Sequence, residues 1–219
     1  MVPVEPLLAT IPPAPPTVRG AQYPYTLRMI PLITHTPRLL LLAASRALLT
    51  AELHKPQYFP VLLGAALPAD WPTGEYDRDA MQFFLEQLTA GGRTAAGWYG
   101  WYALRKATDE APRTLVGAGG FMGPPDALGG VEIGYSVAAD WRGQGLAQEL
   151  VAGLIQLLVA GLIQQAAATG LVRHLVAHTD ADNLAAQRVL LRNGFAPAGP
   201  VPDGRRRFER PLEPAPPAA

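Results

Sequence analysis

Two glycines stand on either side of a single residue where an apolar strand leads into a helix. The strand is expected over residues 131–137, residues 142–145 read Arg-Gly-Gln-Gly, and a run of helix formers begins at Leu146. Glycine lets a backbone approach a ligand closely. The first turn of a helix offers unpaired N–H groups and the positive end of its dipole, which favour phosphate. This spacing therefore predicts a site for a phosphate-bearing cofactor.

The neighbours of these glycines indicate which phosphate ligand to expect. A P-loop needs Lys and then Ser or Thr after its second glycine, where this chain has Leu146 and Ala147, and the dinucleotide fingerprint needs Gly or Ala where Gln148 stands. Residues 142–147 instead fit an Arg/Gln-x-x-Gly-x-Gly/Ala pattern, which resembles the GNAT superfamily of acyl-CoA-dependent N-acyltransferases.

Two further blocks support the same resemblance. Residues 178–195 look like the later GNAT block, in which a strand leads to an Asn-x-x-Ala/Ser helix that ends in Gly-Phe. Residues 36–41 resemble the first strand of the branch related to RimJ and RimL. Together the resemblance spans roughly residues 37–212, which is most of the chain.

The resemblance implies acetyl-CoA as co-substrate. Backbone N–H groups of the glycine loop would hold its pyrophosphate, Arg142 would add positive charge, and Val137 would make main-chain contacts to the pantetheine arm and the thioester. Asn183 would hydrogen-bond the pantetheine or adenosine-phosphate side. The implied cofactor contacts are Val137, Arg142, Gly143, Gln144, Gly145, Leu146, Ala147 and Asn183.

Glu132 is the candidate general base. It lies five residues before Val137 on the same strand, where several GNATs carry a glutamate that deprotonates the amine through water. A carboxylate in an apolar strand is costly unless it faces a wet cleft or a partner, so a solvent-facing or salt-bridged role stays open. The family's usual general acid is a tyrosine, but its position holds Leu190. Water, Ser136, Tyr135 or the amine itself would then protonate the thiolate.

The expected acceptor is a protein or peptide N-terminal α-amine or a small primary amine, acetylated directly in a ternary complex. An α-amine with a pKa of about 7.7–8.0 is roughly 10–20% neutral at pH 7, whereas a lysine amine is only about 0.04% neutral. Acceptor specificity is expected from the irregular segment 56–76. The alternative, motivated by Leu190 and the uncertain base, is a non-catalytic acyl-CoA-binding regulatory GNAT-like domain.

An α+β chain must position these residues. The resemblance implies the GNAT fold, a mixed, mostly antiparallel twisted sheet that splays between its central strands and carries helices on both faces. Hydrophobic periodicity predicts strands near residues 38–42, 97–105, 114–122, 131–137 and 173–178, helices near 45–54 and 77–88 and after 146 and 183, and a final hairpin near 195–210.

Composition limits the remaining possibilities. With 219 residues, 49% of them hydrophobic, the chain suits one domain with a sizeable core. Eighteen basic and 18 acidic residues give no net charge, which argues against nucleic-acid and anionic-membrane partners. The absence of cysteine excludes disulfides and thiol-acyl intermediates. His174 and His178 lack a third ligand, so no metal is expected.

Proline-rich ends set the expected domain organisation. Residues 1–35 are expected to form a poorly ordered extension, 36–212 a single GNAT domain, and 213–219 a disordered tail. The N-terminus lacks the features of a signal peptide, so a cytoplasmic location is expected. The oligomeric state stays open, with a homodimer among the options.

A tandem repeat lies in the expected long helix. Residues 150–156 read Leu-Val-Ala-Gly-Leu-Ile-Gln, and residues 158–164 repeat them. Eight residues add about 12 Å of helix and rotate the residues after them by about 80° around the helix axis. Two interpretations stay open, a lengthened element that serves a partner surface and a local duplication that extends the helix beyond the sheet.

Overall fold

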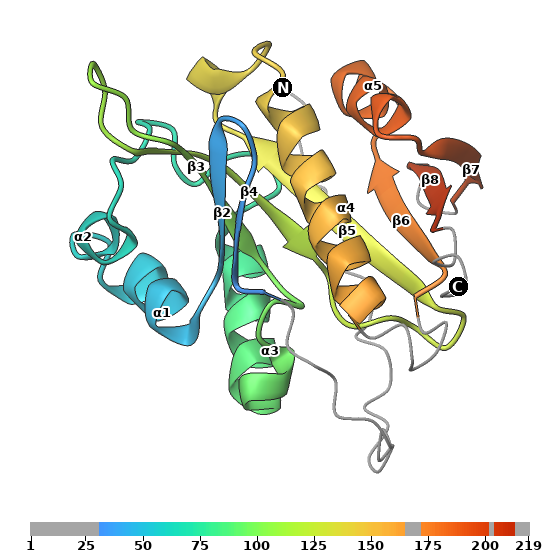
Figure 1. Ribbon diagram of the computed structural model, residues 1–219, viewed down its shortest axis with the longest axis horizontal. Coiled ribbons are helices and arrows are strands. Elements are labelled where there is room, and N and C mark those ends of the chain that lie inside the picture. The colour runs from blue at the N-terminus through green and yellow to red at the C-terminus, as the bar shows by residue number, and fades with distance from the viewer. Residues whose placement is uncertain (1–30, 165–171, 202–203, 213–219) are drawn as a thin grey trace, which may run out of the picture.

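The computed structural model describes residues 31–164, 172–201 and 204–212, and their strands form one sheet in the order β1-β2-β3-β4-β5-β6-β8-β7 (Figure 1). All neighbouring strands are antiparallel except β5 and β6, which run parallel. The mixed, mostly antiparallel sheet expected from the sequence is confirmed. The strands are β1 (Ile33–His35), β2 (Leu39–Ala43), β3 (Trp101–Arg105), β4 (Thr114–Phe121), β5 (Gly130–Val137), β6 (His174–Thr179), β7 (Ala196–Pro200) and β8 (Arg206–Pro211).

Helices cover both faces of the sheet. Figure 1 shows α4 in front of the central strands and α3 behind them. The long helix α4 contacts β1, β2, β4 and β5, and α5 packs against α4 and β6. On the opposite face α1 packs against α2 and α3. The helices are α1 (Arg46–His54), α2 (Phe59–Leu63), α3 (Arg78–Ala95), α4 (Leu146–Gln164) and α5 (Leu184–Arg192).

Three helices begin at short polar side chains that cap them. Ser45 accepts a hydrogen bond from the amide of Leu48 at the start of α1, and Asp77 accepts one from Ala80 at the start of α3. Asn183 accepts one from Ala186 at the start of α5. Such caps satisfy amides that have no partner in the first turn, so the sequence marks these starts correctly.

Several expected boundaries need correction. The segment expected to be irregular contains α2. Pro60 is compatible with this helix because it lies in the first turn, where the missing amide has no helical partner to lose. Helix α3 extends past the expected end at residue 88 and continues to Ala95, with a kink at Gly92, whose backbone is not helical. Strand β3 begins only at Trp101, after a turn in which the amide of Trp98 bonds the carbonyl of Ala95.

The ends of the chain bear on the expected domain limits. The sheet includes residues before 36, since Ile33–His35 form β1 and pair with β2. Residues 1–30 of the proposed extension and the proposed tail at 213–219 lie outside the described residues. The two copies of the repeat both fall within α4.

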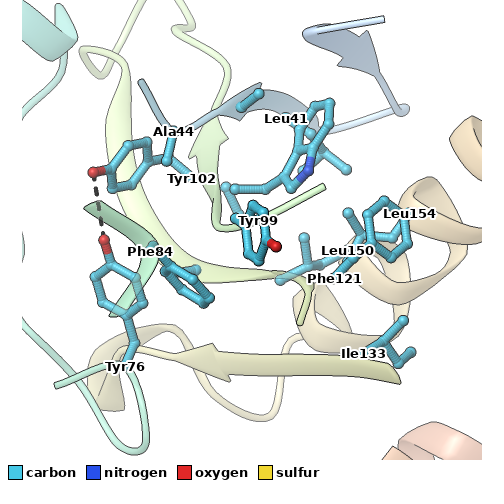
Figure 2. Packing of buried hydrophobic residues seen from close by; sticks show 14 of the residues in the cluster. Leu41, Ala44, Tyr76, Phe84, Tyr99, Tyr102, Phe121, Ile133, Leu150 and Leu154 are labelled. Atoms are coloured by element: carbon cyan, nitrogen blue, oxygen red, sulfur yellow. Dashed lines mark hydrogen bonds between the residues drawn. The ribbon is translucent and has the colours of Figure 1, made fainter. Parts of the chain in front are cut away.

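The core lies between α4 and the sheet and continues on the opposite face. Figure 2 shows Leu150 and Leu154 of α4 beside Phe121 of β4 and Ile133 of β5. Phe121, Leu150 and Leu154 are fully buried and Ile133 is nearly so. Small residues allow this close packing, because a Cβ added at Gly153 would lie only 2.7 Å from Cδ1 of Leu41.

Replacing Gly153 should therefore destabilise the protein. Gly153→Val adds a branched side chain against Leu41 and Thr36, and overpacking of this kind costs about 1–3 kcal/mol. Chemical denaturation followed by circular dichroism measures the loss. The control is Ala90→Val at an exposed site on α3, which should lose clearly less stability. Equal losses would contradict the tight contact.

Candidate active site

The two parallel strands in the middle of the sheet separate after a short paired stretch. β5 and β6 pair through Gly130–His174, Val131–Leu175 and Glu132–Val176, and no later pair joins them within the described part of the chain. β5 nevertheless continues to Val137, paired on its other edge with β4. The sheet is therefore splayed between β5 and β6, as expected.

The splay leaves main-chain groups of β5 without a strand partner. The carbonyl of Glu132 accepts from the amide of Met122, and the amide of Ala138 donates to the carbonyl of Val116. Antiparallel pairing alternates along a strand, so the even-numbered residues between these two bond β4. The main-chain groups of Tyr135 and Val137 consequently face the gap toward β6.

The glycine loop lies at the end of this gap. Gly143 and Gly145 have φ of 74° and 77°, in the left-handed region that glycine adopts without strain. In the described residues no backbone or side-chain acceptor bonds the amides of residues 143–147, and the first bond of this kind joins the amide of Glu149 to the carbonyl of Gly145. Five successive amides at the start of a 19-residue helix are therefore available to an anion.

A half-buried acid on α4 connects the loop to the turn between β1 and β2. Glu149 accepts hydrogen bonds from the hydroxyl of Thr36 (2.6 Å), the amide of Arg38 (2.7 Å) and Nε of Arg38 (2.6 Å). Nη1 of Arg38 donates in turn to the carbonyl of Gln144 (2.9 Å). Burial opposes ionisation of Glu149, but the hydrogen bonds from Thr36 and Arg38 outweigh it and lower the pKa. The carbonyl of Gln144 thus points at Arg38.

Arg142 connects the loop to the strand before it. Its Nε donates to the carbonyl of Val137 at 2.9 Å. One edge of the guanidinium is therefore occupied by protein, and only its Nη groups are left for a phosphate. This hydrogen bond links the loop to the end of β5.

Glu132 and His178 meet across the two parallel strands. Oε1 of Glu132 lies 2.8 Å from Nδ1 of His178. Glu132 is directly opposite Val176, so His178 lies two residues further along β6 on the same face. The Glu132 side chain is 42% exposed and that of His178 is 16% exposed. Of the roles left open for Glu132, the structure shows a paired carboxylate, and its partner is His178.

The connection between α2 and α3 lies over the end of β5. Oδ2 of Asp70 accepts from the amide of Ala139 at 2.8 Å. Gly74 lies so close that a Cβ there would be 2.4 Å from Oγ of Ser136. We call residues 70–76 the acceptor wall, because they cover β5 on the face that carries Ser136.

Glu52 of α1 is hydrogen-bonded to the acceptor wall. Its carboxylate accepts from Nε1 of Trp71 (2.7 Å) and from the hydroxyls of Tyr76 (2.9 Å) and Tyr102 (2.6 Å). Figure 2 shows Tyr76 and Tyr102 with their hydroxyls facing one another. Burial raises the pKa of Glu52, against the opposing effect of these three bonds. Trp71 and Tyr76, at the two ends of the segment 71–76, are therefore hydrogen-bonded to the same carboxylate.

Several carboxylates lie near Glu75 of the acceptor wall. Burial raises the pKa of Glu75, and the nearby charge of Asp180 raises it further, while Arg205 lowers it and Asp77 and Glu132 add smaller increases. These groups are close enough for their charges to interact. The region is consequently suited to a cationic partner.

Helix α5 borders the gap from the other side. The hydroxyl of Tyr135 crosses to it and donates to the carbonyl of Ala186 at 2.9 Å. Burial raises the pKa of Tyr135, so the phenol keeps its proton. Asn183 uses Oδ1 to cap the helix. Leu190, at the position of the usual tyrosine, is 1% exposed and belongs to the core.

The structure brings most of the sequence-predicted residues to one place. Val137, Arg142 and residues 143–147 adjoin one another at the end of β5, with Glu132 on the same strand, and Asn183 stands on the helix across the gap. The roles of Arg38, Glu149, Glu52 and His178 were not foreseen. The one local signal for Glu52 was a carboxylate between Ala51 and Leu53, both buried.

Two classes of feature are absent from the residues that the structure describes. No cluster of three or more histidine or acidic side chains suited to a metal ion occurs there, His174 and His178 included. No helix in those ranges is both long and apolar enough to cross a membrane.

Comparison with known proteins gives a consistent result. The sequence model of the acetyltransferase (GNAT) domain matches residues 48–196. A curated relative, the uncharacterized N-acetyltransferase YjdG of Bacillus subtilis (strain 168), is 28% identical over 137 residues, which cover 61% of this chain and 71% of that protein.

Solved structures share the fold. The chain resembles RimL, a ribosomal L7/L12 α-N-protein acetyltransferase in complex with coenzyme A, with a TM-score of 0.53 and 18% identity over 84% of this chain and 98% of that one. It also resembles the ribosomal-protein-S5-alanine acetyltransferase of Vibrio fischeri, with a TM-score of 0.52 and 12% identity over 82% and 96%.

The Glu149 contacts generate a prediction about acid sensitivity. Because the folded pKa of Glu149 lies below its ordinary value of 4.5, its stabilisation is present above that value and is lost as the pH falls through the folded pKa. Glu149→Gln should lower the free energy of unfolding at pH 7 by about 1–3 kcal/mol. The difference from wild type should shrink below pH 4.5.

Denaturant titrations between pH 3 and pH 7 would measure this difference. Glu86→Gln is the matched control, because Glu86 is exposed on α3 and bonds only Gln82 in the described structure. A Glu149→Gln deficit that stays constant across the range would show that ionisation of Glu149 is not what stabilises the loop.

Proposed function

The chain belongs to the acetyltransferase (GNAT) family, and on that basis we propose that it transfers the acetyl group of acetyl-CoA directly to a primary amine in a ternary complex. The acceptor is a protein or peptide N-terminal α-amine or a small amine. The observation that carries the proposal is the row of five acceptor-free amides at residues 143–147, placed where β5 leaves the paired sheet.

The loop provides for the pyrophosphate of the cofactor. Its amides and the N-terminal end of the α4 dipole stabilise negative charge without a lysine. Arg142 adds its Nη groups, while its Nε stays on Val137. Because Arg38 and Glu149 hold the carbonyl of Gln144 in place, the loop is already arranged before the ligand arrives.

The exposed edge of β5 provides for the thioester. The main-chain groups of Tyr135 and the amide of Val137 face the gap, so a pantetheine arm bonds them much as another strand would, while the carbonyl of Val137 stays with Arg142. An amide of Val137 directed at the thioester oxygen stabilises the negative charge that develops there during attack. RimL, whose structure contains coenzyme A, shares this fold.

The charges beside β5 favour an amine acceptor. The charges of Asp180 and Glu132 both act on Glu75, and a cationic ammonium near Glu75 relieves this repulsion. The amine must lose a proton before it attacks, and Glu132 serves that deprotonation. Since the chain has no cysteine, no thiol of the protein carries the acetyl group, in keeping with direct transfer.

The departing thiolate needs a proton from a group other than Leu190. The hydroxyl of Tyr135 is engaged with Ala186 and keeps its proton because burial raises its pKa. We therefore assign this proton to the amine itself, which must release one as the amide forms, or to water.

A second candidate function is a non-catalytic acyl-CoA-binding regulatory domain. The observation that favours it is the burial of Leu190 where the family's usual acid stands. Titration of acetyl-CoA with and without a panel of amines separates the two. Thiol release with an amine supports the enzyme, and tight binding without release under any amine supports the regulatory domain.

Substitution in the loop tests cofactor binding. Gly145→Val forces a branched residue into a backbone with φ of 77° and moves the amides away from the pyrophosphate. Calorimetry should show that the Kd for coenzyme A rises by roughly 100-fold, which equals about 2.8 kcal/mol. Gly92→Val is the control, because Gly92 has φ of 56° and lies on α3. Equal affinity in both variants would remove the loop from the proposed site.

Substitution on the strand tests the chemistry. Glu132→Gln keeps the shape but removes the charge, so kcat should fall by about 10- to 100-fold while the Kd for coenzyme A stays unchanged. Glu209→Gln is the control, since Glu209 is opposite Val176 on the same face and pairs with Arg207. Thiol release by both variants at the wild-type rate would exclude Glu132 from the reaction.

A further inference from the structure

We propose that His178 accepts the proton of the acceptor amine at Nε2, and that Glu132 acts behind it to hold the imidazole in its accepting form. This inference rests on the proposed function, because it concerns the base of the same transfer. It changes the role of Glu132 from a base that contacts the amine, directly or through water, to a positioning carboxylate.

The position of His178 along the gap supports this assignment. Glu132 and Val176 form the last pair between β5 and β6. His178 lies two residues beyond Val176, on the part of β6 that has separated from β5. The splayed stretch of β5, which ends at Val137, lies in the same direction. His178 therefore lies beyond the last pair between the two strands, Glu132 and Val176, in the direction of the gap.

The hydrogen bond fixes the protonation pattern of the pair. A carboxylate only accepts, so the imidazole nitrogen 2.8 Å from Oε1 of Glu132, Nδ1, carries a proton. In a neutral imidazole the other nitrogen, Nε2, is then the unprotonated one. Such a bond also orients the ring and stabilises the imidazolium that forms.

Nε2 is free to take up a proton. It has no hydrogen-bond partner among residues 31–164, 172–201 and 204–212. In the same ranges every buried side-chain nitrogen and oxygen has a partner, so Nε2 is not buried. The 16% exposure of the His178 side chain therefore includes the atom that the reaction needs.

The charged groups around the pair come from three directions. Arg207 on β8 is opposite His178, and Glu209 is opposite Val176 and pairs with Arg207. Asp180 follows β6, and Glu75 belongs to the acceptor wall, where it interacts with Asp180, Arg205 and Glu132. Among them Glu132 is the one that contacts the imidazole.

Every proton and electron pair in the transfer is accounted for. The acceptor enters as an ammonium and gives one proton to Nε2, which leaves a neutral amine and an imidazolium. The nitrogen lone pair attacks the thioester carbon, a C–N bond forms, and the C–S bond breaks with its electrons on sulfur. The nitrogen's second proton passes to the thiolate, giving the amide and coenzyme A. The imidazolium then releases its proton to water.

The pH dependence of kcat tests the assignment, with the same amine in every assay so that its own titration is common to all variants. Wild type should lose activity on the acidic side, as the accepting imidazole becomes protonated. His178→Asn should lower kcat by about 100-fold and remove this acidic limb. Glu132→Gln should keep the limb and move it to lower pH, because the imidazolium loses its carboxylate partner.

Two further measurements separate catalysis from structure. Added imidazole should restore part of the activity of His178→Ala and none of that of Glu132→Gln. His174→Asn is the matched control, four residues earlier on the same strand, and should keep the wild-type profile. Calorimetry should give all these variants the wild-type Kd for coenzyme A, which establishes that each is folded.

The opposite pattern overturns the inference. If Glu132→Gln loses the acidic limb while His178→Asn keeps it, Glu132 is the base and His178 only its neighbour. Absence of rescue by imidazole, with a His178→Asn rate near wild type, would likewise exclude His178 as the base. If wild type releases no thiol with any amine, the proposed function fails first, and this inference fails with it.

Discussion

The separation of β5 from β6 after Glu132 and Val176 is the constraint on which the candidate site depends. A strand in the middle of a sheet normally satisfies its main chain on both edges. β5 does so on the β4 side over residues 133–137, but beyond Glu132 its other edge faces an opening. The polypeptide tolerates this because polar molecules can enter the opening and bond the exposed main chain. The same geometry leaves amides available beside a glycine loop. One local loss of pairing thus creates both the place and the hydrogen-bonding groups for a ligand.

Contacts between distant parts of the chain keep this opening in shape. Arg38 and Glu149 tie the start of β2 to the first turn of α4, and through Gln144 they reach the loop itself. Asp70 and Glu52 tie the acceptor wall to the end of β5 and to α1. Tyr135 spans the gap to α5. Gly145 lies beside Arg38, whose hydrogen-bond partners are already in place, whereas Gly143 faces open space.

The sequence predicted what depends on neighbours along the chain. Ser45, Asp77 and Asn183 cap the helices that they were expected to start, and the strand, turn and glycine loop at the end of β5 follow from local residue types. Contacts across long separations left no such signal. Glu132 meets His178 46 residues away, and Glu149 meets Arg38 111 residues away. Strand β1 was also missed, because a three-residue strand is stable only through its pairing with β2.

The buried carboxylate of Glu52 has an evolutionary consequence. Three neutral donors, on Trp71, Tyr76 and Tyr102, converge on it. An apolar residue in its place would leave the indole N–H of Trp71 and one of the two tyrosine hydroxyls without an acceptor, since those hydroxyls also bond one another. Losing one donor likewise leaves a desolvated charge with less support. Descendants of this chain should therefore either keep the quartet whole or replace it as a unit with apolar residues, so these four positions should covary across homologues more strongly than their distance from the reacting atoms would suggest.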